Sequence, residues 1–318
     1  MSDFPKAVQI NEEGPREGFQ FEKGPIPTSR KVELIDALSE TGLKHIQIAS
    51  FVNPKRVPGW ADAEEVVAHY NRKPGIHYTA LWLNPKGLLR AIETHRLDVE
   101  GSFSLTASAK FLARNQQSSL EDNIARAHET LRLYKQHSIK LKRAGIMAAF
   151  GCNFQGEIPH SLVLDLVQQL LDICAEHDMP PEVLSLADTM AWATPKSIRE
   201  LVGKVRNRYP EMTLSLHLHD TRGMGIANAY AGLEMGVAVF DSTVAGLGGC
   251  PFAAHKGAAG NVCTEDLVFM LDEMGIETGI DLDRLIEVAR LAEDIVGHPL
   301  PGSVKMGGSL KALRAQMH

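Results

Sequence analysis

The sequence predicts an α/β protein of the (β/α)8 TIM-barrel class with an extra C-terminal helix. Short apolar or β-branched runs alternate eight times with amphipathic segments of helical period. Strands that alternate with helices form βαβ units and a parallel sheet. Eight such units in 318 residues suit a barrel, whose typical size is ~250 residues. An open doubly wound sheet is the alternative, but no G-x-G-x-x-G pattern follows the first strand.

The predicted strands are short and end next to polar or glycine-rich segments. They cover residues 6–11, 45–51, 77–83, 99–105, 144–150, 183–188, 213–219 and 238–246. The predicted helices between them include 29–42, 120–137, 159–178 and 194–210, and the extra C-terminal helix covers 280–297. Because no Pro/Gly/Ser-rich linker interrupts this pattern, we expect one barrel domain over residues 1–318.

Local signals support the helix ends. Asn84 and Thr194 each precede a proline, which is favoured at the first helical position. Leu34, Ile35 and Leu38 share one helical face, and Gly42 stands where a C-cap is expected.

Composition excludes several functional classes. The formal net charge is -6 and no long basic run occurs, which argues against a nucleic-acid partner. No run of about 18 apolar residues predicts a membrane span. The N-terminus lacks the pattern of a secretory signal, and the four cysteines form no CxxC pair. We therefore expect a cytoplasmic protein with reduced thiols and no membrane or nucleic-acid partner.

The stretch LSLHLHDT, residues 214–221, is the most informative for chemistry. Alternate residues of a strand point to the same face, so His217 and His219 project together. They end the seventh predicted strand, at the edge where barrel enzymes place their active sites. Two adjacent imidazoles there suit a divalent metal. Alternatively, each is a hydrogen-bonded rim histidine, or the H-x-H pair belongs to a metal-dependent hydrolase, which usually carries it on the first strand.

Other strand ends offer further polar side chains. Asp188 ends the sixth strand, and a glycine-rich segment follows the eighth. The remaining candidates at these ends are Arg16, Glu17, Gln20, Lys23, Cys250, Asn261 and Glu265. Singly, Asp188 or Asn261 is explained as a helix cap, and Cys250 as a small buried side chain. Their shared placement at strand ends predicts one site.

Several motifs resemble the 3-hydroxy-3-methylglutaryl-CoA lyase family, a group of metal-dependent TIM-barrel enzymes. They are EGPREGFQFEK at 13–23, SFVNPKRVP at 50–58, GCNFQGEI at 151–158, DSTVAGLGGCP at 241–251 and GNVCTEDLVFML at 260–271. The resemblance covers nearly the whole chain. It implies cleavage of a 3-hydroxy acyl-CoA to acetyl-CoA and a keto acid, with bound Mg²⁺ or Mn²⁺ and assembly as a homodimer or higher homo-oligomer.

The resemblance also implies roles for individual residues. The metal ligands would be Glu17, His217, His219 and Asn261. Arg16 would stabilise the enolate oxygen, Asp188 would assist proton transfer, Cys250 would act as acid and base, and Glu265 would support that site. Gln20, Lys23, Gln47 and Asn115 would lie near the substrate.

Three positions depart from the family pattern. Glu17 replaces its aspartate, Gln47 replaces a glutamate, and Gly145 replaces a tyrosine, which predicts extra space. A related substrate, such as citramalyl-CoA or an isoprenoid glutaryl-CoA, therefore remains an alternative. A Claisen-type condensing synthase and a non-catalytic metal- or ligand-binding barrel remain alternatives too.

Overall fold

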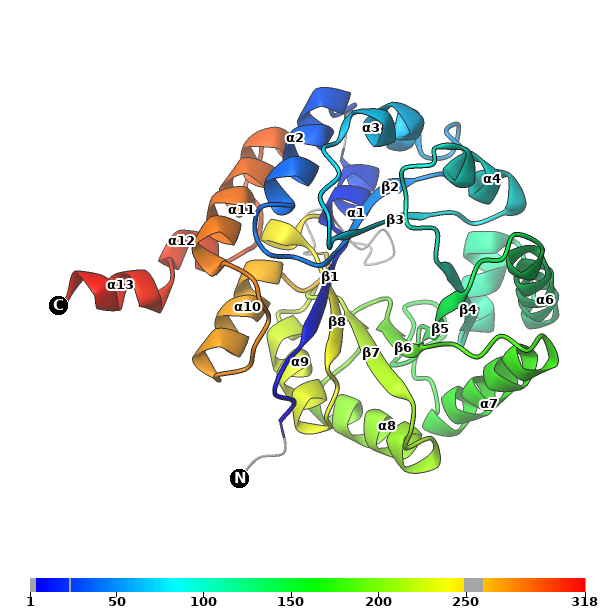
Figure 1. Cartoon of the computed structure of the whole chain (residues 1–318). Helices are drawn as coiled ribbons and strands as arrows, with labels where there is room; N and C mark the ends of the chain where they lie inside the picture. The colour runs from blue at the N-terminus through cyan, green and yellow to red at the C-terminus, as the bar shows by residue number, and fades with distance from the viewer. Residues whose placement is uncertain (1–3, 23, 249–259, 318) are drawn as a thin grey trace. The chain divides into compact units, whose positions relative to one another are not determined.

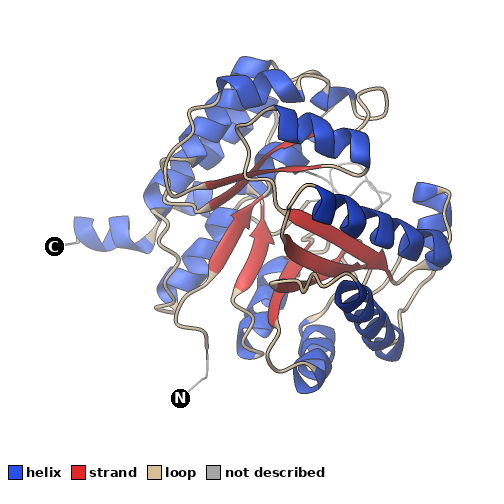
Figure 2. Cartoon of the chain, turned by 45° about the vertical axis from the view of Figure 1, so that its right-hand side comes forward, coloured by secondary structure: helices blue, strands red, loops and turns tan. Residues whose placement is uncertain are grey.

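Strands and helices alternate along the chain in this computed structural model, which describes residues 4–22, 24–248 and 260–317 (Figure 2). The chain divides into two compact units. One is built on Glu100–Phe240, and the other on Lys6–Val99 together with the chain from Asp241 onward. The expectation of a single domain over residues 1–318 stays a prediction.

The first unit contains a parallel sheet with strands in the order β8-β7-β6-β5-β4. Its strands are β4 (Gly101–Thr106), β5 (Leu141–Met147), β6 (Val183–Asp188), β7 (Thr213–Leu218) and the first half of β8 (Val239–Ser242). Its helices are α5 (Ala109–Phe111), a π-helical turn (Leu112–Gln116), α6 (Leu120–Gln136), α7 (His160–Glu176), α8 (Pro195–Arg208) and α9 (Gly225–Glu234). Figure 1 shows α6, α7 and α8 following one another around these strands.

The two faces of this sheet differ in residue type. Leu184 pairs with Leu214 and Leu186 with Leu216, and all four leucines are buried. A Cβ atom added to Gly232 of α9 would lie 2.6 Å from Leu216, so this leucine faces the helices. Ser185, Ser215, Ala187 and His217 occupy the alternate positions. The side chain of His217 therefore points to the face of the sheet away from the helices.

The second unit begins with three parallel strands in the order β3-β2-β1, followed by the second half of β8. The strands are β1 (Gln9–Glu12), β2 (His45–Ser50) and β3 (His77–Leu81). The helices are α1 (Gly14–Phe21), α2 (Thr28–Leu38), α3 (Ala63–His69), α4 (Pro85–Glu93), α10 (Thr264–Glu273), α11 (Leu282–Val296), α12 (Val304–Gly307) and α13 (Leu310–Gln316), with 3-10 turns at Pro58–Trp60 and Val244–Gly246.

Most sequence predictions about elements are confirmed. Each predicted strand overlaps an observed one, and Asn84 and Thr194 cap α4 and α8 by accepting from the amides of Gly87 and Ser197. Gly42 is not the cap of α2, which already ends at Leu38. Its φ of +95° and a hypothetical Cβ at 2.3 Å from the Gly279 carbonyl explain why glycine is needed there.

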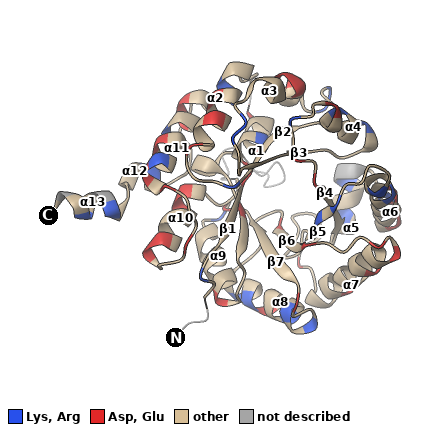
Figure 3. Cartoon of the chain, viewed as in Figure 1, with Lys and Arg blue, Asp and Glu red and all other residues tan. Residues whose placement is uncertain are grey.

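The helices of the described segments are too short or too polar to cross a membrane. Figure 3 shows acidic and basic positions interspersed on the helices.

Candidate functional site

The histidine pair lies at the carboxyl end of β7, as the alternation of strand residues predicts. The ring centroids of His217 and His219 are 5.1 Å apart. The Nδ1 atom of His219 lies 2.9 Å from the main-chain oxygen of Asp188. A carbonyl oxygen only accepts, so Nδ1 carries the proton and Nε2 carries the lone pair. A carbonyl that fixes the tautomer in this way is typical of metal-binding histidines.

Asp188 joins this group from the end of β6. Its Oδ1 accepts hydrogen bonds from the amides of Trp192 (2.7 Å) and Ala193 (3.0 Å). Its Oδ2 is buried and has no hydrogen-bond partner within the described segments. Burial raises the pKa of Asp188 to about 6, while His219, the two amides and His217 oppose the rise. This carboxyl can therefore exchange a proton near neutral pH.

Arg16 is the centre of a second group, in the other unit. Its guanidinium donates to the Gln47 amide oxygen and to the Glu13 carboxylate, and its Nη1 lies 3.1 Å from Glu17 Oε2. Burial lowers the pKa of Arg16, but the carboxylates of Glu13, Glu17 and Asp241 raise it above its ordinary value. The Arg16 carbonyl also accepts from the Trp60 indole at 2.8 Å. Arg16 is thus a buried, fixed cation.

Glu12 lies at the end of β1 and accepts three hydrogen bonds. Its Oε1 accepts from the amides of Gly14 (2.7 Å) and Val244 (2.9 Å), and its Oε2 accepts from the Thr264 hydroxyl (2.6 Å). A Cβ atom at Gly14 would lie 2.5 Å from Oε1, so only glycine allows this contact. The fully buried Glu12 therefore connects β1 to the segment after β8 and to α10.

Glu12 and Glu13 were missed by sequence reasoning. The first strand was predicted to end at Asn11, which placed both residues in a loop. Charged residues directly after an apolar run were the signal that could have identified them. The helix α1 was missed for the same reason, although Pro15, its second residue, was visible.

Asn261 and Glu265 flank the start of α10, and both are buried. Neither amide atom of Asn261 has a hydrogen-bond partner in the described part of the chain. A buried amide without protein partners fits a residue whose oxygen is meant for a ligand such as a divalent metal. Asn261 is thus a suitable oxygen donor for such an ion.

Glu265 lies against Gly302, near the C-terminal end of the chain. Its Oε2 accepts from the Ala245 amide at 2.9 Å. Burial raises its pKa to about 7, against the opposing effect of the Cys263 thiol and the Ala245 amide. A Cβ atom at Gly302 would lie 2.3 Å from Glu265 Oε1, and the Gly302 amide donates to the Ala245 carbonyl. Asp266, next to Glu265, accepts from the amides of Ser303 and Val304.

The other predicted residues have different outcomes. Lys23 and Cys250 lie outside the described residues, and so does the side chain of Asn115 in the π-helical turn. Gln20 is on α1, and its amide oxygen is buried without a partner in the described segments. A Cβ atom at Gly145 would lie 2.9 Å from the Ser185 carbonyl, so this position of β5 favours glycine. Extra room for a substrate beside Gly145 stays a prediction.

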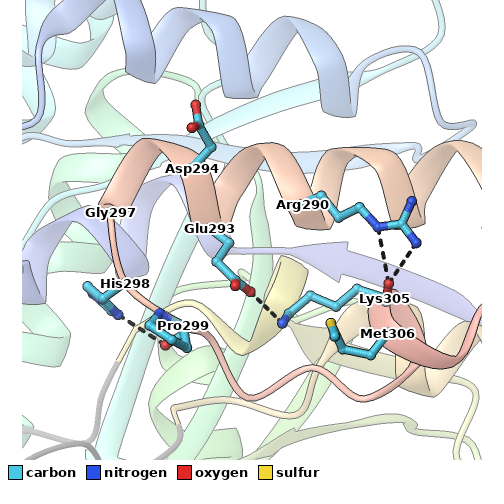
Figure 4. A pocket seen from close by; sticks show the side chains of 8 residues that line it. All are labelled: Arg290, Glu293, Asp294, Gly297, His298, Pro299, Lys305 and Met306. Carbon is cyan, nitrogen blue, oxygen red and sulfur yellow. Dashed lines mark hydrogen bonds and ion pairs between the residues drawn. The ribbon is translucent and has the colours of Figure 1, made fainter.

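A surface pocket lies elsewhere, between the end of α11 and α12 (Figure 4). Two of its basic side chains have partners within the pocket. Lys305 forms an ion pair with Glu293, and the Arg290 guanidinium donates to the Lys305 carbonyl. None of the residues predicted for the site lines this pocket.

The alternating fold and the strand-end histidines define a (β/α)8 protein with the donors of a metal-dependent enzyme. A sequence model of the HMGL-like family matches residues 7–292. The chain belongs to this family.

Similar proteins cover almost the full length of the chain. Hydroxymethylglutaryl-CoA lyase of Gallus gallus is 40% identical over 285 residues, which are 89% of this chain and 92% of that protein. A Pseudomonas aeruginosa protein named 3-hydroxy-3-isohexenylglutaryl-CoA/hydroxy-methylglutaryl-CoA lyase is 38% identical, with 93% and 95% covered.

Solved structures of hydroxymethylglutaryl-CoA lyases are similar to this chain as well. A hydroxymethylglutaryl-CoA lyase from Pseudomonas aeruginosa matches with a TM-score of 0.87 at 37% identity, over 98% of this chain and 99% of that one. An HMG-CoA lyase from Acinetobacter baumannii in complex with coenzyme A and 3-methylmalate matches with a TM-score of 0.85 at 36% identity, over 97% of each chain. These matches confirm the predicted (β/α)8 barrel.

Proposed function

We propose that this protein is a divalent-metal-dependent carbon–carbon lyase that cleaves a 3-hydroxy-3-methylglutaryl-CoA-like thioester to acetyl-CoA and a keto acid. The observation that carries the proposal is the His217–His219 pair. The pair ends β7, and the Asp188 carbonyl fixes the tautomer of His219. Membership of the HMGL-like family supports the same reaction.

The proposed metal ligands are Glu17, His217, His219 and Asn261, with Mg²⁺ or Mn²⁺ as the ion. Imidazole nitrogen and carboxylate or amide oxygen suit such ions. When bound, the ion supplies a Lewis acid for the hydroxyl of the substrate. The orphaned amide of Asn261 and the Nε2 lone pair of His219 support this assignment.

Asp188 is proposed to accept the hydroxyl proton. Its Oδ1 is held by backbone amides, so its Oδ2 is directed by a rigid loop. Its pKa of about 6 leaves it mostly ionised at neutral pH, as a general base requires. Loss of the proton lets the C2–C3 bond break, which gives the ketone and the enolate of the thioester.

Arg16 is proposed to stabilise the enolate oxygen. A cation that is already oriented by Glu13 and Gln47 needs little rearrangement when negative charge develops. Cys250 is proposed to protonate the enolate carbon, and Glu265 to support that step. Gln20, Lys23, Gln47 and Asn115 are proposed to contact the substrate.

Assembly and location are part of the same proposal. We expect an acyl-CoA ligand, a homodimer or higher homo-oligomer and a cytoplasmic location. Light scattering coupled to size-exclusion chromatography measures the assembly directly.

Product analysis tests the reaction. The protein is stripped with a chelator, restored with Mg²⁺ or Mn²⁺, and given 3-hydroxy-3-methylglutaryl-CoA and citramalyl-CoA. We expect metal-dependent formation of acetyl-CoA and acetoacetate from the first, detected by mass spectrometry. Cleavage of citramalyl-CoA alone would change the substrate but keep the mechanism. Metal binding without cleavage of either would reject the lyase and favour a synthase or a binding protein.

A further inference from the structure

An apolar cluster lies at the same strand ends as the histidine pair, within the first unit. Phe111, Cys152 and Met190 are fully buried, and three partly buried side chains, those of Met147, Phe154 and Trp192, pack against them. These residues follow or end β4, β5 and β6. The proposed chemistry uses none of them, yet three of the apolar side chains keep some exposed surface.

The strand register places Met147 on the same level as His217. Ile146 pairs with Leu186, so the next residue, Met147, is level with Ala187, and Ala187 pairs with His217. All three occupy the face of the sheet away from the helices. Two strand spacings of ~4.8 Å separate Met147 from His217, which makes about 10 Å between their Cα atoms. Ala187, on the strand between them, has only a methyl group as its side chain.

The cluster is also connected to Asp188. The Trp192 amide donates to Asp188 Oδ1 at 2.7 Å, and the Trp192 indole donates to Asn153 at 2.7 Å. The rings of Phe111 and Phe154 are parallel, with centroids 6.5 Å apart. Hydrogen bonds and ring packing therefore hold this apolar wall in place relative to the proposed base.

Gly145 lies one level lower on the same face and has no side chain, and Ser185 of the neighbouring strand approaches to 2.9 Å of its hypothetical Cβ. Met147 is therefore the last residue of β5 whose side chain points to this face.

We propose that Met147, with Phe154 and Trp192, receives the substituent on C3 of the substrate and that this wall accepts apolar groups longer than methyl. The inference rests on the proposed lyase function, in which His217 would help to hold a metal that polarises the C3 hydroxyl. A substituent on that carbon would lie near His217, and burying each methylene of an apolar substituent against the wall would favour binding. Met147 is then a specificity-determining residue.

The test compares kcat/KM for two thioesters that differ only at C3, 3-hydroxy-3-methylglutaryl-CoA and 3-hydroxy-3-hexylglutaryl-CoA. We expect the wild-type protein to cleave the hexyl compound at least as well as the methyl compound. Met147→Trp fills the space and should lower the hexyl-to-methyl ratio at least about tenfold. Met147→Ala enlarges it and should raise the ratio about threefold or more, which keeps the test available if the tryptophan variant does not fold.

Met179→Ala is the matched control. Met179 is a buried methionine of the first unit, and it precedes β6, at the strand end opposite to that of Met147. The hexyl-to-methyl ratio of kcat/KM in Met179→Ala should equal that of the wild type. A ratio within twofold of wild type in both Met147 variants, or failure of the wild type to cleave the hexyl compound, would overturn the inference alone. Failure to cleave any thioester would overturn the proposed function and the inference together.

Discussion

Glu13 and Arg16 form an ion pair one helical turn apart at the start of α1, and both side chains are nearly buried, at 6% and 11% exposure. The pair Arg30–Glu33 has the same spacing, but its side chains are 32% and 44% exposed. Desolvation distinguishes the two pairs. Solvent screens the exposed pair, whereas the buried pair fixes the direction of a guanidinium.

Glu13→Ala should lower kcat about tenfold to a hundredfold with KM changed less than about threefold, because Arg16 loses a charged partner that orients it. Glu13→Gln keeps a hydrogen-bond acceptor, so its kcat should fall less than that of Glu13→Ala. Steady-state kinetics on the cleaved thioester measures both. Glu33→Gln is the control and should leave kcat unchanged. Equal effects of Glu13→Ala and Glu33→Gln would contradict a positioning role for Glu13.

Asn261→Ala should separate metal binding from stability. Its buried amide has no hydrogen-bond partner within the described segments, so its removal should cost the metal-free protein less than about 0.5 kcal/mol. Affinity for Mn²⁺, measured by calorimetry, should fall at least about tenfold.

Asn123→Ala is the control for both measurements, the stability and the Mn²⁺ affinity. Asn123 is also buried, but it accepts from the Thr106 amide and donates to the Ser104 carbonyl. Its loss should destabilise the protein by about 1–3 kcal/mol and leave Mn²⁺ affinity unchanged. The reverse pattern would show that Asn261 is a structural residue.

His217→Ala and His219→Ala should each weaken Mn²⁺ binding by at least about a hundredfold, more than the loss of an outer-shell partner typically costs. His69→Ala, at an exposed position on α3, should have no effect. Calorimetric titration of the chelator-stripped protein gives the comparison. Unchanged Mn²⁺ affinity in both strand variants would rule out the histidine pair as ligands.

Glu12→Gln should change how stability depends on pH. Burial raises the pKa of Glu12 from 4.5 to about 7, so its protonated form is favoured in the folded protein. This stabilisation is complete below pH 4.5 and is lost as the pH rises through about 7. The amide of the variant cannot ionise, so it should keep this stabilisation at every pH. Above about pH 7 the variant should therefore be more stable than the wild type by up to about 3 kcal/mol.

Thermal unfolding of the metal-free protein from about pH 5 to about pH 8 compares the Glu12→Gln variant with wild type. The wild-type midpoint should fall more steeply as the pH rises. Glu265 and Asp188 titrate with the same sign and remain in both proteins, so the difference isolates Glu12. Parallel curves would mean that Glu12 is ionised throughout.

The fold and the histidine pair were predictable because both follow from periodicity. The period of strand residues places His217 and His219 on one face, and the register pairs Ala187 with His217. The contacts of Arg16 could not be predicted in the same way. The partner of Arg16, Gln47, is 31 residues away in sequence. The same holds for Glu12, which accepts from the Val244 amide across 232 residues. Such contacts depend on how distant strands align.

The close approach of Gly302 to Glu265 bears on how shortened versions of this protein should be made. Every residue proposed for catalysis precedes Asp266, so a chain cut after α11 would retain all of them. It would lose Gly302, which covers Glu265, and the amides of Ser303 and Val304, which bind Asp266. Water would then reach the Glu265 carboxylate. Proteolytic trimming or a bulky fusion partner near position 302 should thus damage the enzyme from outside its catalytic sequence.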